Sequence, residues 1–130
     1  MKLLLDTHIW LWSYGDAKRV PPRIAKAINA TDNELWLSPI SVWEAELLIE
    51  AGRLRLKGDP HRWIANALEI SQLTEAPVTH EVARESRRVG LAHQDPADRF
   101  LAATASVYDL VLATVDDRLL AGKGFRTMGD

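Results

Sequence analysis

The sequence has no cysteine, no long apolar run and no excess of positive charge. Without cysteine there can be no disulfides, zinc–thiolate sites or thiol chemistry, and the composition is typical of a cytoplasmic protein. No apolar run approaches the roughly 18 residues that a membrane span needs, so we expect no membrane partner. The N-terminus carries one lysine and a short apolar run with charge close behind it, so we expect no signal peptide.

The charge and length narrow the function classes further. General nucleic-acid binders are usually basic, whereas this chain has a net charge of −2, so any phosphate contact must come from local patches or from a bound metal. A chain of 130 residues with 47% hydrophobic residues fits one domain, which we place at residues 1–130. That length can bury a core without disulfides.

Short apolar runs alternate with helical patterns along the chain. We expect strands at 3–5, 35–37, 73–79 and 110–114, the third weakened or pushed to an edge by Pro77. Helices are predicted at 9–14, 22–29, 39–51, 61–70, 81–89 and 97–108, and the tail from Gly122 is predicted to be partly irregular. This alternation predicts an α/β sandwich whose small, mostly parallel sheet is flanked by helices.

Four carboxylates occupy related places in this pattern. Asp6 ends the first strand, Asp116 follows the last, and Glu44 and Asp98 lie in the early turns of two helices. Because a parallel sheet brings its strand ends to one edge, these four residues should meet at one rim. Crowded carboxylates either share protons or bind a cation, and oxygen ligands select Mg²⁺ or Mn²⁺. Such a cation can polarise a phosphoryl oxygen, which indicates hydrolysis of a phosphodiester.

Each of these acids also has a purely structural interpretation. Asp6 could cap the first helix, Asp95 with Asp98 resembles a capping box, and Asp98 could only pair with a helix dipole. Of Asp116 and Asp117, one could be the ligand and the other a cap. Glu44 has no capping role if its helix starts at Ser38-Pro39, and it shares a face with apolar residues, so it needs a partner.

Four sequence blocks resemble a PIN-domain ribonuclease of the VapC toxin type. They are LLLDTHIW (3–10), SPISVWEAELL (38–48), HQDPADRFLAATA (93–105) and LVLATVDDRL (110–119). The resemblance implies a PIN-like three-layer sandwich and metal-dependent cleavage of RNA with Mg²⁺ or Mn²⁺. It assigns the acids to Asp6, Glu44, Asp98 and Asp116, and it favours Asp116 over Asp117 through the pattern Thr-x-Asp. Supporting hydroxyls fall on Thr7 and Thr114. It also implies an antitoxin partner and a homodimer.

Positive charge near the acids suggests phosphate contacts. Arg99 adjoins Asp98, and its planar fork suits a phosphate, although a salt bridge to a nearby acid is an equal alternative. Basic runs at 84–88 and 18–23 are expected mainly as solvated faces, with RNA contact as the alternative. We expect structural or rim roles for His8 and His93. The five tryptophans are expected mostly in the core, with an interface as the alternative.

Three rival classes fit less well. A haloacid-dehalogenase-like phosphatase needs a second aspartate where this chain has His8. A receiver domain needs adjacent acids after its first strand and a lysine after a late one, and neither is present here. The non-enzyme alternative is a degenerate PIN-like module that only binds protein, which would have no reason to keep four acids in place.

Overall fold

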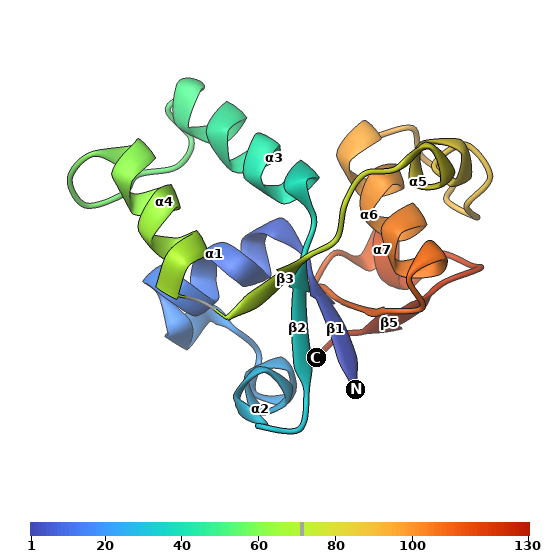
Figure 1. Cartoon of the computed structure of the whole chain (residues 1–130), viewed down its shortest axis with the longest axis horizontal. Helices are drawn as coiled ribbons and strands as arrows, with labels where there is room; N and C mark the ends of the chain where they lie inside the picture. Colours follow the sequence, from blue (N-terminus) through green and yellow to red (C-terminus); the bar gives the residue numbers. More distant parts are fainter. Residues whose placement is uncertain (71) are drawn as a thin grey trace.

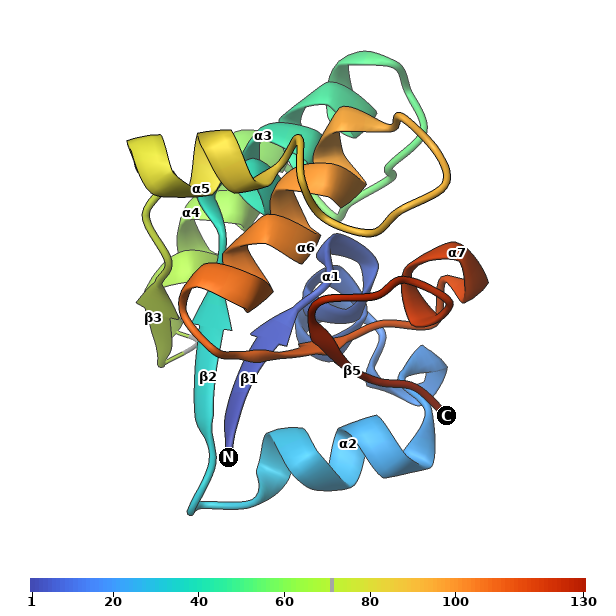
Figure 2. The same ribbon diagram turned by 90° about the vertical axis from the view of Figure 1, so that its right-hand side faces the viewer.

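The computed structural model describes residues 1–70 and 72–130, and five strands within them form one sheet in the order β3-β2-β1-β4-β5. All four neighbouring pairs run parallel. The strands are β1 (Lys2–Leu5), β2 (Glu34–Leu37), β3 (Leu73–Glu75), β4 (Val111–Ala113) and β5 (Arg126–Met128). Figure 2 shows β1 and β2 side by side, with both arrowheads directed away from the N-terminus.

Helices cover both faces of this sheet (Figure 1). They are α1 (Thr7–Gly15), α2 (Pro22–Asn29), α3 (Pro39–Glu50), α4 (Pro60–Ile70), α5 (His80–Glu85), α6 (Pro96–Val107) and α7 (Asp117–Leu120), with a short 3₁₀ turn η1 (Ala17–Arg19). Since successive strand residues point to opposite faces, Leu3 and Leu5 pack with α1 to α4, whereas Leu4 packs with α5 to α7. Both faces of β1 are therefore buried, which explains its unbroken apolar run. The expected three-layer α/β sandwich is confirmed.

Local capping chemistry explains where several helices begin. Ser38 accepts a hydrogen bond from the Ile40 amide, and Pro39 occupies the first position of α3. Asp95 caps α6 in the same way, with Pro96 following it. The side chain of Thr79 caps α5. These starts agree with the sequence prediction.

Four boundaries differ from the prediction. The tail is not irregular throughout, because β5 pairs with β4, with Leu112 opposite Thr127. The helix expected at 81–89 ends at Glu85, and β3 ends at Glu75, two residues before Pro77, at the edge of the sheet. The first helix starts at Thr7 rather than at Ile9, because Asp6 caps it.

The chain reverses its direction of travel across the sheet between β1 and β4. It builds outward from β1 to β2 and β3, then crosses back to add β4 and β5 on the other side of β1. Ligands of open parallel sheets bind at such a switch point, beyond the carboxyl ends of the strands. Asp6 and Thr114 directly follow the two strands that flank it. Within the described residues, no helix is long and apolar enough to cross a membrane.

Candidate active site

A cavity of about 450 Å³ lies at this switch point, and all four predicted acids line it. Asp6 comes from the end of β1, Glu44 from α3, Asp98 from α6 and Asp116 from the turn before α7. The structure thus brings together residues that are up to 110 positions apart in the sequence. The remaining lining residues are His8, Trp12, Arg19, Asp95, Val115 and Arg118.

Hydrogen bonds fix the orientation of Asp6. Its Oδ1 accepts from the Thr7 amide at 2.7 Å, which caps α1, and its Oδ2 accepts from the Thr114 hydroxyl at 2.6 Å. Thr114 in turn accepts from the Asp116 amide at 3.0 Å, so one buried hydroxyl connects the two strand ends. Burial raises the pKa of Asp6 above its ordinary value, although the bonds from Thr114 and Thr7 oppose this effect.

Asp98 is the carboxylate whose protonation the fold disturbs most clearly. It lies in the first turn of α6 and is 7% exposed. Burial, followed by the charges of Asp95, Asp6 and Asp116, raises the pKa of Asp98 to about 7, while Arg118 opposes this rise. The Nε2 atom of His93 lies 3.6 Å from Asp98 Oδ2. Carboxylate repulsion of the kind expected from the sequence is therefore present in this cavity.

Asp116 has a different environment because Arg118 folds back on it. Asp116 caps α7 by accepting from the Arg118 amide at 2.9 Å, and the guanidinium lies 3.2 Å from its Oδ2. Burial raises the pKa of Asp116, but the hydrogen bonds and charge of Arg118 outweigh that effect and hold it below the ordinary value. The same guanidinium reaches Asp98 Oδ2 at 3.5 Å. The neighbouring Asp117 is exposed and does not line this cavity.

The fourth predicted acid, Glu44, and the supporting residue Thr7 have different surroundings. Glu44 is half-buried on α3 and lines the cavity. The Thr7 hydroxyl is fully buried and donates to Ser41 at 3.0 Å, so it connects α1 to α3 instead of touching a carboxylate. Thr7 therefore supports the relative placement of two elements that carry acids.

These carboxylates match a divalent cation in kind, since they offer oxygen atoms of a type that Mg²⁺ and Mn²⁺ prefer. Among the described residues, no three carboxylate, imidazole or thiol groups are close enough to form a ready metal site. Arg118 instead provides the positive charge beside Asp98 and Asp116. A cation that replaced this guanidinium would relieve the same repulsion.

The phosphate contact expected for Arg99 needs correction. Arg99 is 4% exposed, and its guanidinium donates to four backbone carbonyls, those of Ser86, Val89, Leu91 and His93. It faces the segment between α5 and α6, and it does not line the cavity. Its surroundings therefore indicate a structural role. A salt bridge of Arg99 to Asp95 or Asp98 is absent as well, because no carboxylate partner of Arg99 occurs among the described residues.

Sequence reasoning missed the guanidinium that contacts the acids of the cavity, that of Arg118. Arg118 is more than half exposed and follows Asp116 by two residues within the block LVLATVDDRL, so its position in that block was the available signal. Asp95, expected only as a cap, performs that role and also lines the cavity. Arg19 was expected within the basic run 18–23 and Trp12 among the five tryptophans, but nothing local in the sequence places either residue at the acids.

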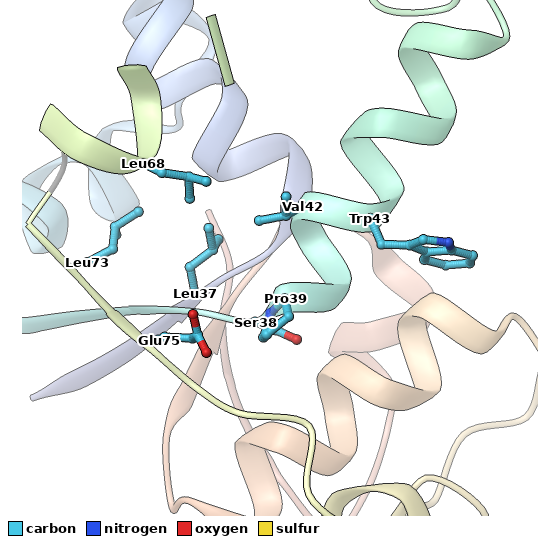
Figure 3. Close-up of a pocket in the computed structure, with 8 residues that line it drawn as sticks. All are labelled: Leu37, Ser38, Pro39, Val42, Trp43, Leu68, Leu73 and Glu75. Atoms are coloured by element: carbon cyan, nitrogen blue, oxygen red, sulfur yellow. The ribbon is translucent and has the colours of Figure 1, made fainter. Parts of the chain in front are cut away.

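A second cavity, of about 550 Å³, lacks this chemistry. It lies between β2, β3, α3 and α4, and Figure 3 shows Leu37, Leu68 and Leu73 pointing toward one another within it. Glu75 is the one carboxylate among its lining residues in the described part of the chain. On α3, Trp43 extends away from this cluster and is 49% exposed. These features suit an apolar partner better than a hydrolytic reaction.

Comparisons with known proteins agree with this fold. Residues 3–124 match the sequence model of the PIN domain. Ribonuclease VapC22 of Mycobacterium tuberculosis (strain ATCC 25618 / H37Rv) is 32% identical over 120 residues, which cover 90% of this chain and 88% of that protein. The VapBC2 structure of Rickettsia felis, bound to a promoter DNA fragment, aligns with a TM-score of 0.73 at 15% identity, covering 99% and 98% of the two chains. DNA-bound VapBC of Salmonella typhimurium gives 0.69 at 23% identity, again covering 99% and 98%. The chain therefore belongs to the PIN-domain family and is of the VapC type.

Proposed function

We propose that this protein is a metal-dependent endoribonuclease that hydrolyses phosphodiester bonds of RNA in the cytoplasm, as the toxin of a toxin–antitoxin pair. The observation that carries the proposal is the gathering of Asp6, Glu44, Asp98 and Asp116 from four elements into one cavity at the switch point of the sheet. The similarity to a protein named as a ribonuclease supports the substrate class.

We assign the cation to the four carboxylates. Asp6, Asp98 and Asp116 would hold Mg²⁺ or Mn²⁺, with Glu44 completing the set or holding a second ion. When bound, the cation would polarise the phosphoryl oxygen and stabilise the charge that develops during hydrolysis. The hydroxyl of Thr114 would keep Asp6 oriented, because it already donates to that carboxylate.

Arg118 supplies positive charge from the protein itself. Its guanidinium is the arginine group at the cavity that contacts two of the acids, and more than half of its side chain is exposed to solvent. A guanidinium can bind two oxygens of a phosphate at once. We therefore assign to Arg118 the substrate-phosphate role first expected of Arg99.

The test compares two adjacent aspartates. The purified chain is incubated with total cellular RNA in Mg²⁺, in Mn²⁺ and in EDTA, beside the variants Asp116→Asn and Asp117→Asn. We expect cleavage that requires metal and falls by at least about 100-fold in Asp116→Asn, because a direct ligand is lost. Asp117→Asn, a matched change at an exposed position outside the cavity, should cleave normally.

Three results would contradict the proposal. Cleavage that persists in EDTA would exclude the assigned cation. Equal activity of Asp116→Asn and the unchanged protein would remove the acids from the reaction. If neither RNA cleavage nor Mn²⁺ binding is detected, the protein-binding alternative replaces the enzyme.

We propose two protein partners, a cognate antitoxin and a second copy of the chain. Large apolar side chains on α3 and α4 remain exposed in the single chain, with Trp43 at 49%, Leu47 at 42% and Leu68 at 40%. Trp43 and Leu68 also line the apolar cavity of Figure 3, whose volume of about 550 Å³ suits an apolar segment of the antitoxin. The structural neighbours that are VapBC complexes support the antitoxin.

Each partnership has its own measurement. Light scattering of the isolated chain should give twice the monomer mass if the homodimer forms without the antitoxin. Co-expression with a candidate antitoxin should yield a complex, and Leu68→Ser should weaken it. A monomer mass would exclude a homodimer of the isolated chain, and a complex unaffected by Leu68→Ser would move the antitoxin to another surface.

A further inference from the structure

A second groove adjoins the acidic cavity and has the opposite charge. It has a volume of about 410 Å³ and lies between α1, η1, the loop that follows α3, and α4. His8, Trp12 and Arg19 line both this groove and the acidic cavity, so the two are continuous at these residues. Its cations are Arg19, Arg55 and Lys57, against one carboxylate, that of Asp16.

Trp12 lies at the boundary between the two cavities. Its indole is partly buried, with the Arg19 guanidinium over the ring at 4.6 Å from the centroid and the His8 ring at 5.8 Å. Two planar groups thus already stack or tilt against this indole. An aromatic ring held in this way beside cations is how proteins bind single-stranded nucleic acid, since every base can stack on it.

The far wall of the groove depends on close packing at Gly15. A Cβ atom at this position would lie 2.9 Å from Trp63 Cζ2, so the absence of a side chain lets α4 approach α1. Tyr14 holds the Trp63 ring edge-on, with the ring centroids 4.8 Å apart. Packed aromatic rings therefore form part of the border of the groove.

We propose that this groove binds the nucleotides of a single-stranded RNA that flank the bond cleaved in the acidic cavity. Trp12 would stack on a base, and Arg19, Arg55 and Lys57 would contact the phosphates. The proposal rests on the ribonuclease function proposed above. It also explains how a chain with a net charge of −2 holds a polyanion, because the positive charge is concentrated beside the acids.

Binding can be measured separately from cleavage. Fluorescence anisotropy with a labelled eight-nucleotide single-stranded RNA is carried out in EDTA, because the groove contacts need no metal. Trp12→Ala should weaken binding by about 5- to 100-fold, and Trp12→Phe should restore most of it. Arg19→Gln should weaken binding and reduce the slope of log affinity against log salt by about 0.7. A duplex of the same sequence should bind more weakly, because its bases are already stacked.

Arg84→Gln is the matched control, because it removes one exposed arginine from α5, outside the groove. It should leave the affinity unchanged. The groove is excluded if the unchanged protein does not bind RNA in EDTA, if Trp12→Ala binds normally, or if Arg84→Gln weakens binding as much as Arg19→Gln. Thermal unfolding of each variant checks that it is folded.

Cleavage of total RNA by the unchanged protein with Mn²⁺ separates the two proposals. If the protein cleaves RNA while Trp12→Ala binds and cleaves normally, the groove is wrong and the ribonuclease stands. If the protein neither cleaves RNA nor binds Mn²⁺, the ribonuclease fails, and the groove proposal that rests on it fails as well.

Discussion

At the scale of single residues, Asp98 and Asp116 line one cavity but have pKa values shifted in opposite directions. Burial and neighbouring carboxylates raise the pKa of Asp98 to about 7, whereas Arg118 holds that of Asp116 below its ordinary value. Near neutral pH the metal-free protein therefore keeps Asp116 charged and Asp98 partly protonated. Bound metal would favour the charged form of both.

The shift at Asp98 predicts how the stability of the metal-free protein depends on pH. Since the folded pKa lies above the unfolded value of 3.8, the folded state binds the proton more tightly. This contribution is complete below about pH 4 and is lost as the pH rises through about 7. The asparagine side chain of the Asp98→Asn variant carries no charge. At pH 8 in EDTA the free energy of unfolding of this variant should therefore exceed that of the unchanged protein by on the order of 2 kcal/mol.

Urea denaturation at pH 5 and at pH 8 checks this prediction. The advantage of Asp98→Asn should shrink at pH 5, where the unchanged protein also keeps the proton. The free energy of unfolding of Asp98→Asn should still fall with rising pH, but less steeply, because the pKa of Asp6 is raised as well. Asp117→Asn, at an exposed position, should follow the unchanged protein. An Asp98→Asn variant that is less stable at pH 8 would show that the carboxylate is not repelled there.

At the scale of elements, Arg99 holds the segment between α5 and α6. Ser86 is the C-cap of α5, and its carbonyl, left without a partner at the end of the helix, accepts from Arg99 Nε at 2.8 Å. The carbonyls of Val89, Leu91 and His93 accept from the other nitrogens. This segment leads directly into Asp95 and α6, so Arg99 acts on the site by fixing the backbone that precedes Asp98.

Replacing Arg99 by lysine should therefore destabilise the fold. Lysine keeps the charge but cannot reach four carbonyls, and a buried cation with too few partners is costly, so we expect a loss of about 2–4 kcal/mol. Urea denaturation measures this loss, with Arg84→Lys on the exposed face of α5 as the control. A variant with unchanged stability but weakened RNA binding would restore the phosphate role first expected of Arg99.

The elements predicted correctly from the sequence are those whose limits depend on local chemistry. The run Leu3–Leu5 and the cap-proline pair Ser38-Pro39 each carry their own signal. The strand β5 was missed because its three residues, Arg126–Met128, are placed by hydrogen bonds to β4. The end of α5 was missed for the same reason, since the carbonyl of its C-cap Ser86 accepts from Arg99 of another helix.

At the scale of the whole molecule, the order of the strands decides which side chains meet. The four acids were predictable because strand ends of a parallel sheet gather at one edge, and that rule needs no side-chain detail. The contact of Arg118 with two acids and the groove at Trp12 were not predictable, because they depend on how far side chains reach and on the packing of α4 against Gly15. The general location of the site thus follows from topology, and its charge balance follows from packing.

This topology predicts that metal binding stabilises the entire fold. The proposed ligands are up to 110 positions apart, so the site does not exist in the unfolded chain. Mn²⁺ at about 100 times its Kd should raise the free energy of unfolding by about 2.7 kcal/mol and the Tm by several degrees, as a thermal melt with and without EDTA would show. Asp98→Asn should lose most of this rise, although it is the more stable protein without metal, whereas Asp117→Asn should keep it. A full rise in Asp98→Asn would place the Mn²⁺ outside the acidic cavity.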